Sequence, residues 1–342
     1  MKYLYILTSS EKDLYYEQFF LSISSLRLHN PNAFIVALID SKTKAGLTGK
    51  RSGYEQVVSQ VVTVVAPEEL SQKEVSRWLK SSMKKYVTGD FLYIDCDTII
   101  AASLDGDFSP EIKIGAVLDT HVGLDDHFLA PHFMREDLAL GFSSFNTGLR
   151  YNSGVMFCRD LSEVDELFNR WHELWLFSKK KGSTQDMPAL NQASEELGGA
   201  ITEIGGEWNC HIAHNGLPFL ADAKIIHYFA TVFDFIDCPF ILGSRKTFLS
   251  VKEAGEISPE IMALLKNPKA AFESHSRIIA DKAELDVINS KIFLLLLMLR
   301  KKSPRFFKAI NSLLIRLRHN RIIKKIYRRP VAREIVIRRE KS

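Results

Sequence analysis

Short apolar runs and longer stretches with helical periodicity alternate through the first 240 residues. Apolar residues fill consecutive positions in the runs, which predicts strands buried on both faces of a sheet. We expect these strands at residues 2–7, 34–39, 57–65, 91–94, 112–118 and 152–157, with two short ones at 201–204 and 223–227. Strand, helix and strand within the first 40 residues predict a parallel pair with a crossover helix, and therefore an α/β fold.

Apolar residues at spacings of three and four predict helices at about 13–28, 67–87 and 162–178, and another that opens at 185–191. In the second of these, Arg77, Lys80 and Lys84 share a face that is separate from the apolar stripe. Residues 121–151 have no clear periodicity, so we expect a long polar loop of the kind that serves as a lid or a binding segment.

The chain after residue 240 has a different pattern, because its strand signals end there. From Pro259 onward only helical periodicity remains, and residues 303–327 alternate Arg and Lys with Phe, Ile and Leu. That alternation predicts one or two amphipathic, cationic helices. We therefore expect an α/β domain at 1–240, a helical extension at 241–290 and a basic amphipathic tail at 291–342.

Composition excludes several classes of protein. A chain of 342 residues, 46% of them hydrophobic, can bury a large core, so a disordered protein is excluded. The four cysteines are widely spaced without a C-x-x-C pair, which indicates neither a disulfide framework nor a zinc site and fits a reducing compartment. The N-terminus runs directly into a strand pattern and the longest apolar run is 292–299, so we expect no signal peptide and no membrane-spanning helix.

Charge is divided sharply along the chain. The formal net charge is +4. Residues 291–342 carry 17 Lys and Arg and two acids, whereas the first 290 residues carry 28 Lys and Arg and 39 Asp and Glu. An acidic body with a strongly basic tail predicts a polyanionic partner for the tail.

Two acids follow the strand at 91–94 one residue apart, at Asp95 and Asp97. Carboxylates at the end of a buried strand repel each other and resist desolvation unless a cation lies beside them. Oxygen ligands of this kind suit Mg²⁺ or Mn²⁺, which keep positions open for phosphate oxygens. The plainer alternative is an Asp-rich turn in which Asp97 caps the next element.

Several short motifs follow one another in a fixed order. They are a Thr8 turn after the first strand, Asp40 after the second, the basic helix, Asp95-x-Asp97, Asn152-Ser153-Gly154, Asp186 with Ala189-Leu190-Asn191, Trp208-Asn209 and Ile225-Ile226-His227-Tyr228. In this order, over roughly residues 1–240, the chain resembles the GT-A glycosyltransferases, in particular the family-8-like group that includes glycogenin and lipopolysaccharide galactosyl- and glucosyltransferases. The resemblance implies a Rossmann-like nucleotide-diphospho-sugar transferase domain.

The resemblance also implies roles for individual residues. Asp95 and Asp97 match the D-x-D motif that binds metal and nucleotide, and His227 matches a further metal ligand. The other matches are Asn152 and Ser153 beside the donor sugar, Asp186 near the anomeric carbon, Arg77 as a basic donor-binding residue, and Thr8 and Asp40 at the nucleotide base. The cofactor implied is Mn²⁺ or Mg²⁺, and the donor is a nucleotide-diphosphate sugar.

The sequence departs from the family pattern at two places. Phe229 to Phe233 contain neither the Gly nor the Lys that often follow the metal-binding His, so the donor phosphates must be neutralised by the metal, by Arg77 or Lys80, or by Arg245 or Lys246. Met187 replaces a Gln common in the family. Asp186 could stabilise a cationic sugar with retention, as the family implies, or deprotonate the acceptor with inversion; the residues leave both outcomes open.

Other functions compete with this one. Asp95-Cys96-Asp97-Thr98 imitates the D-x-D-x-T motif of haloacid-dehalogenase-like phosphatases, in which the first Asp is a nucleophile. Against this, Thr98 comes one place early and the motif is not in the first strand. A nucleotidyltransferase lacks support because no Gly-rich loop follows the first strand. A non-catalytic membrane-surface binding protein is the non-enzymatic alternative.

The tail predicts where the protein works. Its Ile, Leu and Phe residues among 17 bases favour an anionic membrane surface over nucleic acid, which is the less favoured partner. We expect a peripheral enzyme on the cytoplasmic face of the cell membrane, acting on a glycan or lipid-linked glycan in lipopolysaccharide or capsule biosynthesis.

Overall fold

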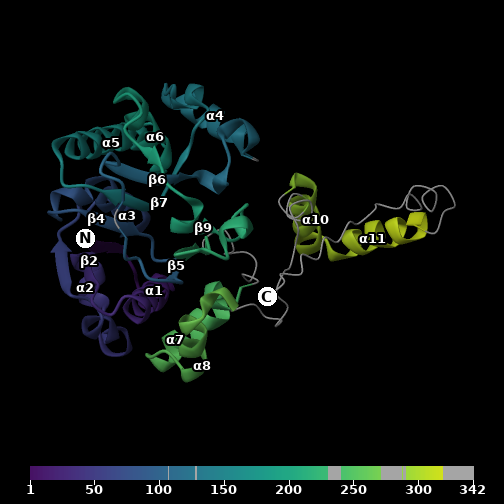
Figure 1. Cartoon of the computed structure of the whole chain (residues 1–342), viewed down its shortest axis with the longest axis horizontal. Coiled ribbons are helices and arrows are strands. Elements are labelled where there is room, and N and C mark those ends of the chain that lie inside the picture. The colour runs from purple at the N-terminus through teal and green to yellow at the C-terminus, as the bar shows by residue number, and fades with distance from the viewer. Residues whose placement is uncertain (107, 128, 230–239, 271–286, 288–289, 319–342) are drawn as a thin grey trace, which may run out of the picture. The chain divides into compact units, whose positions relative to one another are not determined.

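The computed structural model describes residues 1–106, 108–127, 129–229, 240–270, 287 and 290–318 (Figure 1). The chain divides into two compact units, residues 1–279 and 280–342. The first unit includes the sheets, their helices and also α7 (Arg245–Ala254) and α8 (Pro259–Lys266), which contact α1 (Tyr15–His29). The predicted boundary at residue 240 stays a prediction.

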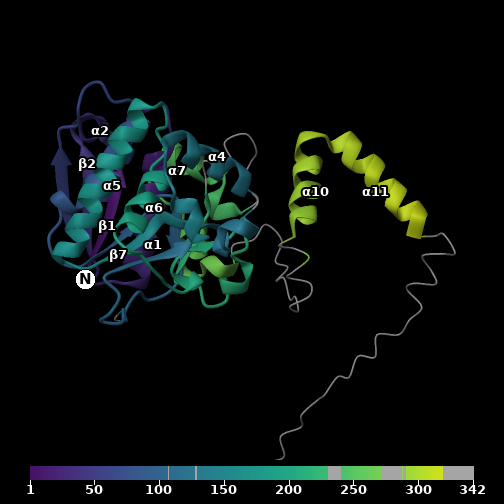
Figure 2. The same ribbon diagram turned by 90° about the horizontal axis from the view of Figure 1, so that it is seen from above.

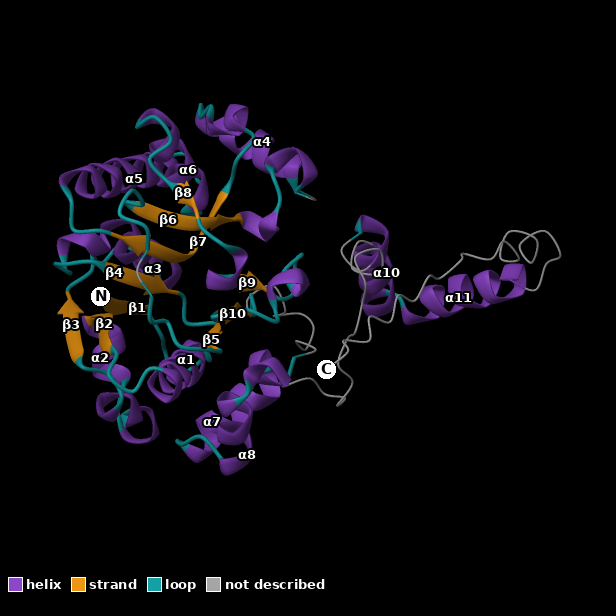
Figure 3. Ribbon diagram, in the orientation of Figure 1, coloured by secondary structure: helices purple, strands orange, loops and turns teal. Residues whose placement is uncertain are grey.

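The larger sheet has seven strands, which lie side by side in Figure 3. Their order is β3 (Gln60–Val64), β2 (Phe34–Asp40), β1 (Lys2–Leu7), β4 (Phe91–Ile94), β7 (Tyr151–Cys158), β6 (Ile114–Leu118) and β8 (Thr202–Glu203). All neighbouring pairs are parallel except those of β7, which is antiparallel to both β4 and β6. The predicted α/β fold with a parallel first pair is confirmed.

Each face of this sheet has its own core, because successive side chains of a strand point to opposite faces. In β1, Tyr3, Tyr5 and Leu7 join the core under α1, whereas Leu4 and Ile6 join the other. That second core is covered by α3 (Gln72–Ser82), α5 (Ser162–Lys180) and α6 (Met187–Glu196). Trp171 and Trp175 of α5 are fully buried there, as their spacing of four residues predicts.

A smaller sheet has three strands, β5 (Thr98–Ile100), β10 (Ile225–His227) and β9 (Cys210–His211) (Figure 3). β10 lies in the middle, antiparallel to β5 and parallel to β9. Only three residues separate β4 from β5, so the chain passes from one sheet to the other through Asp95, Cys96 and Asp97. The Asp-x-Asp motif is therefore the junction of the two sheets.

One expectation is wrong: residues 121–151 are not one long loop. They contain α4 (Ala130–Leu140), with Pro131 in its first turn and Gly141 ending it at φ 80°. Only Ala130, Asp137 and Leu140 of this helix are buried, while Met134 and Leu138 are exposed. The helix thus lacks the apolar stripe by which a buried helix is recognised in a sequence.

The long basic helix begins later than expected. Ser71 and Glu74 form a capping box, in which the Ser71 N–H donates to Glu74 Oε2 (2.8 Å) and the Glu74 N–H donates to Ser71 Oγ (3.4 Å). This reciprocal pair starts α3 at Gln72 rather than at Pro67. The other predicted strands and helices of this unit have ends that differ from the observed ones by no more than three residues.

Short helices complete this unit. α2 (Ser41–Gly46) follows β2 directly, and 3₁₀ turns connect many of the other elements. These turns are η1 (Gly49–Arg51), η2 (Gly53–Gln56), η3 (Met83–Lys85), η4 (Asp119–His121), η5 (Leu124–Asp126), η6 (Ser144–Thr147), η7 (Gly206–Trp208), η8 (Leu217–Phe219), η10 (Ile241–Gly243) and η11 (Pro268–Ala270). Cys96, Cys158 and Cys210 are free thiols.

The second unit contains α10 (Lys291–Lys302) and α11 (Pro304–Arg318), which meet at a bend (Figure 2). Pro304 explains the bend, because a proline at a first helical position ends the preceding helix. The predicted amphipathic segment 303–327 is helical to Arg318, and its remainder lies outside the described residues. Within the described part of the chain, no helix combines the length and the apolar character needed to cross a membrane.

Candidate active site

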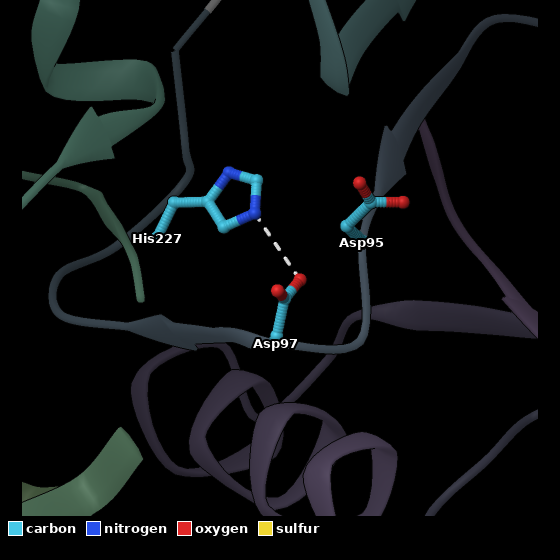
Figure 4. A group of neighbouring side chains, drawn as sticks. All are labelled: Asp95, Asp97 and His227. Carbon is cyan, nitrogen blue, oxygen red and sulfur yellow. Dashed lines mark hydrogen bonds and ion pairs between the residues drawn. The ribbon is translucent and has the colours of Figure 1, made fainter. Parts of the chain in front are cut away.

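Asp95, Asp97 and His227 form a cluster of cation-ligating atoms (Figure 4). Each offers one ligand atom, and these atoms lie within 4.8 Å of one another. The pairing of the smaller sheet brings them together, because His227 is the register partner of Thr98, the residue next to Asp97. His227 Nε2 lies 3.1 Å from Asp97 Oδ1.

The cluster fits a divalent cation by its chemistry. Two carboxylates and one imidazole nitrogen are a donor set that divalent ions accept. Nδ1 of His227 is already hydrogen-bonded to Asn209 Oδ1 at 2.9 Å, so Nε2 is the ring nitrogen that faces the carboxylates. A ligating His whose other nitrogen is held in this way is the usual arrangement of protein metal sites.

Gly154 makes room for the cluster. A Cβ at this position would overlap the His227 ring and would lie 3.0 Å from Asp95 Oδ2. The backbone of β7 therefore runs against the site, and the Asp95 N–H donates to the Gly154 carbonyl (2.7 Å). This close approach requires glycine within Asn152-Ser153-Gly154.

A second group of charges adjoins the cluster. Asp186 is buried, with Arg77 Nε 3.0 Å from Oδ1 and Lys80 Nζ 3.7 Å from Oδ2. Lys80 Nζ also lies 3.1 Å from each oxygen of Asp95, and it lies over the Tyr93 ring at 5.0 Å. Lys80 is thus a cation shared by Asp95 and Asp186.

These neighbours set the protonation state of Asp186. Burial would raise the pKa of its carboxyl, but the charges of Arg77 and Lys80 and the Ser153 hydroxyl outweigh burial and lower the pKa to about 2. The Ser153 hydroxyl donates to Asp186 Oδ2 at 2.8 Å. Asp186 is therefore a carboxylate at neutral pH.

The amide of Asn152 is bound to protein groups at both ends. Its Nδ2 donates to Asp119 Oδ1 (2.8 Å), and its Oδ1 accepts from the Gly154 N–H (2.8 Å) and from Asn209 Nδ2 (3.1 Å). Asp119 also accepts from His127 Nε2 (3.1 Å). Burial would raise the pKa of the Asp119 carboxyl, but these hydrogen bonds from His127 and Asn152 hold it below its usual range.

Thr8 directly follows β1, and Asp40 is the last residue of the neighbouring parallel strand β2. The Asp40 carboxylate caps α2, accepting from the Thr43 N–H (3.0 Å) and hydroxyl (2.5 Å). The Thr8 carbonyl accepts from Gln72 Nε2 (3.1 Å) at the start of α3. Their predicted contacts with a nucleotide base stay a prediction, at the strand ends where open α/β sheets bind ligands.

Strained backbone flanks the site. Among the described residues, the non-glycine residues with positive φ are Thr120 (54°), His121 (58°), Asn215 (55°) and Phe229 (49°). Thr120 and His121 follow Asp119, and Phe229 follows His227 by two residues. Such conformations cost of the order of 1–3 kcal/mol each and persist at functional sites where the surrounding structure enforces them.

Sequence reasoning missed Asp119, His127 and Tyr93 as parts of the site. Asp119 follows β6 directly, and Asp40 is the last residue of β2, so an acid at a strand end was the available signal. His127 was hidden in the segment expected to be a loop. The Tyr93 hydroxyl donates to Asp95 Oδ1, and the available signal was the spacing of two, which places residues on the same face of a strand.

No protein-family model matches the chain, and no curated protein matches its sequence. Solved structures do match. The galactosyltransferase LgtC, in complex with donor and acceptor sugar analogs, has 14% identity and a TM-score of 0.48 over 77% of this chain and 99% of that one. The chain is similar to glycosyltransferases. Mouse xyloside xylosyltransferase 1 matches with 13% identity and a TM-score of 0.44, over 66% of this chain and 96% of that one. Glycosyltransferase GlyE of Streptococcus pneumoniae matches with 16% identity and a TM-score of 0.45, over 78% of this chain and 62% of that one.

Proposed function

We propose that this chain is a metal-dependent glycosyltransferase that moves a hexose from a nucleotide-diphosphate sugar, a UDP-sugar, to a glycan or lipid-linked acceptor with retention of configuration. One observation carries the proposal: Lys80 bridges Asp95 of the cation cluster and the buried Asp186. A cation site and an ionised carboxylate side by side are what transfer from a sugar diphosphate requires, because the leaving group is anionic and the sugar becomes cationic.

The chain's residues divide this work. Asp95, Asp97 and His227 would hold Mn²⁺ or Mg²⁺, which when bound would neutralise the diphosphate leaving group. The Lys80 ammonium, buried beside Asp95, would add positive charge for the same phosphates. Asp186, kept ionised by Arg77 and Lys80, would stabilise positive charge on the sugar.

The donor-binding roles extend to neighbouring residues. Ser153 holds the Asp186 carboxylate, and Asn152 adjoins it in β7, so both would line the side of the donor sugar. Thr8 and Asp40 would bind the nucleotide base at the ends of β1 and β2. Arg245 and Lys246 are exposed at the start of α7 and would be the alternative phosphate-binding residues.

A donor screen tests the proposal. The protein is incubated with UDP-, GDP-, dTDP- and CMP-sugars plus Mn²⁺, and nucleotide release is measured with and without chelator. We expect release from one donor class, abolished by chelator and by Asp97→Asn, and unchanged in Asp160→Asn, whose carboxylate is at the surface and pairs with Lys84.

Small phosphate esters, added to the same screen, distinguish a phosphatase from a glycosyltransferase. A phosphatase that uses Asp95 as a nucleophile would release inorganic phosphate from small phosphate esters without any sugar donor. Phosphate release from such esters, with no nucleotide release from any donor, would overturn the glycosyltransferase proposal. Absence of both activities in metal-loaded protein would favour the non-catalytic binding protein.

We also propose that the C-terminal unit binds an anionic membrane surface and places the enzyme on the cytoplasmic face of the cell membrane. In α10, Ile292 is 71% exposed, and Leu295 and Met298 are exposed as well. Arg300, Lys301 and Lys302 form the last turn of the same helix. Exposed apolar residues beside clustered bases are the features of a helix that lies in a membrane interface, and a lipid-linked lipopolysaccharide or capsule precursor would then be the acceptor.

A further inference from the structure

Five buried side chains form a continuous chain of hydrogen bonds that ends at the cation cluster. In order they are His127, Asp119, Asn152, Asn209 and His227, and Asn209 is completely buried. Three of its five members lie in separate elements, η4, β7 and β10, and the other two directly follow η5 and η7, so tertiary packing alone assembles it. Because an amide has a donor end and an acceptor end, the orientation of each Asn determines what its neighbour must be.

The orientation of Asn152 is fixed from both sides. The Gly154 N–H can only donate, and its partner at 2.8 Å is therefore the amide oxygen of Asn152. The Asp119 carboxylate can only accept, and its partner at 2.8 Å is therefore the amide nitrogen. The reverse orientation would set a donor against Gly154 and an acceptor against Asp119.

The orientation of Asn209 follows from that of Asn152. Since the Asn152 oxygen is an acceptor, Asn209 must present its Nδ2 to it, at 3.1 Å. The Asn209 oxygen then faces His227 Nδ1 at 2.9 Å. An oxygen acceptor at that distance requires a proton on Nδ1. Nε2 lies 3.1 Å from Asp97 Oδ1, which also accepts, so in the metal-free protein this nitrogen can carry a second proton, whose place a bound cation would take.

The far end of the chain obeys the same rule. The Leu129 N–H donates to His127 Nδ1 at 3.0 Å, so the proton of the neutral His127 ring is on Nε2. That nitrogen donates to Asp119 Oδ2. Each Asp119 oxygen thus receives one hydrogen bond from this chain, and each nitrogen that donates within the chain has one acceptor there.

We infer that Asn209 is a positioning residue: it accepts a hydrogen bond from Nδ1–H of His227 and so keeps Nε2 as the ring nitrogen that faces Asp97 and Asp95 and would ligate a cation. Asn152 and Asp119 set the polarity of Asn209, and they act on His227 only through it. The consequence for cation affinity rests on the proposed function, whereas the Nδ1 proton is a property of the metal-free protein.

The tautomer is measurable directly. Imidazole ¹⁵N shifts and long-range ¹H–¹⁵N correlations of His227, assigned with a His227→Gln variant, distinguish the two nitrogens in metal-free protein in mildly alkaline buffer. We expect Nδ1 to carry a proton in the wild-type protein, whether or not Nε2 carries one as well. A protonated Nε2 with a bare Nδ1 would overturn the inference without any variant.

Three variants test the role of Asn209. Asn209→Leu removes the acceptor, so we expect Nδ1 to lose its proton, which leaves the Nε2–H tautomer paired with Asp97. Mn²⁺ affinity, measured by electron paramagnetic resonance, should fall about 10- to 100-fold. Asn209→Asp keeps an oxygen at Nδ1 and should keep the wild-type tautomer. Asn30→Leu is the control, because Asn30 is a buried Asn that bonds only backbone groups, at Leu104 and Ala102, and it should leave the tautomer unchanged.

The outcomes separate this inference from the proposed function. An unchanged tautomer in a folded Asn209→Leu variant would refute the role of Asn209. If that variant does not fold, the wild-type spectrum and Asn209→Asp decide, since a switch of tautomer in Asn209→Asp would also refute it. The expected tautomer together with no Mn²⁺ binding would refute the metal site alone and leave the role of Asn209 intact.

Discussion

At the scale of single residues, Gly154 decides how closely the larger sheet approaches the cation cluster. His227, Asn152 and Asp95 all converge on the space that a Cβ at 154 would fill. Hydrogen bonds hold Asn152 and His227 to Asn209, and others hold Asp95 to Lys80 and Tyr93, so these side chains have little freedom to move aside. A methyl group at position 154 would therefore displace the side chains of the cation cluster.

We predict that Gly154→Ala costs about 1–3 kcal/mol of unfolding free energy, the usual cost of overpacking, and weakens Mn²⁺ binding at least tenfold. Urea denaturation and electron paramagnetic resonance measure the two effects. Gly46→Ala is the matched control, because a Cβ at Gly46 meets no atom within 4 Å. Equal Mn²⁺ affinity in Gly154→Ala and the wild-type protein would contradict this account of the glycine.

Lys80 and Lys84 lie one helical turn apart and have different partners. Lys80 pairs with Asp95 and Asp186, whereas Lys84 pairs with Asp160 and Asp165. If Lys80 stabilises charge on the donor phosphates, Lys80→Gln should lower kcat/KM for nucleotide release by roughly 10²- to 10³-fold.

Lys84→Gln should change kcat/KM for nucleotide release less than twofold, because it removes only ion pairs with the exposed carboxylates of Asp160 and Asp165, which are weak. Melting temperatures of both variants identify any part of the change that is due to unfolding. Equal losses of activity in the two variants would show that Lys80 has no special role.

At the scale of elements, α5 packs on α3 through a titratable contact. The His172 ring is close to Trp78, and its Nδ1 lies 2.8 Å from the Ser81 hydroxyl. Burial, and then the charge of Lys85, lower the pKa of His172 to about 4. The folded protein therefore binds a proton at His172 less readily than the unfolded chain does, whose His pKa is near 6.5.

It follows that the unfolding free energy decreases as pH falls from about 6.5 to about 4, because the unfolded chain takes up the proton first. His172→Gln keeps an acceptor for Ser81 but does not titrate, so part of this decrease should disappear. His132→Gln, on the exposed face of α4, should leave it unchanged. Urea midpoints measured across this pH range check the prediction, and identical slopes for wild type and His172→Gln would refute it.

At the scale of the whole molecule, charge is segregated between an acidic body and a basic tail. The first 290 residues carry a net −11 and residues 291–342 a net +15. Clustered bases near an anionic bilayer contribute about 1 kcal/mol each, so a few of them determine whether the protein binds. Salt should weaken this binding, since exposed charges are screened within about 10 Å at 0.1 M.

We predict that replacing Arg300, Lys301 and Lys302 by Gln in the full chain weakens binding to phosphatidylglycerol vesicles about 100-fold. This factor corresponds to a loss of roughly 3 kcal/mol of binding free energy, about 1 kcal/mol for each base. Sedimentation with vesicles measures it. Replacing Lys42, Lys180 and Lys266, exposed bases of the first unit, changes net charge equally and should have little effect. Equal losses for the two triple variants, or equal binding to phosphatidylcholine vesicles, would contradict a specific role of the tail.

The sequence by itself determined the strands and most helices of the α/β body, because burial of consecutive apolar residues leaves a local pattern in each run. It also singled out Asp95, Asp97, His227, Asp186 and Arg77 as site residues, and the structure places them in two adjoining groups. The Asp95 and Asp97 pair stood out by its place after a buried strand, whereas His227, Asp186 and Arg77 were singled out by the resemblance of the ordered motifs to a known family.

Only the tertiary structure decided how these residues act together. The pairing of β10 with β5 sets His227 beside Asp97, from residues 130 apart in the chain. Whether Lys80 faces solvent or Asp186, and which ring nitrogen of His227 carries a proton, depends on hydrogen bonds between separate elements. A linear pattern holds no record of such contacts, because their geometry arises only when the two sheets and α3 pack.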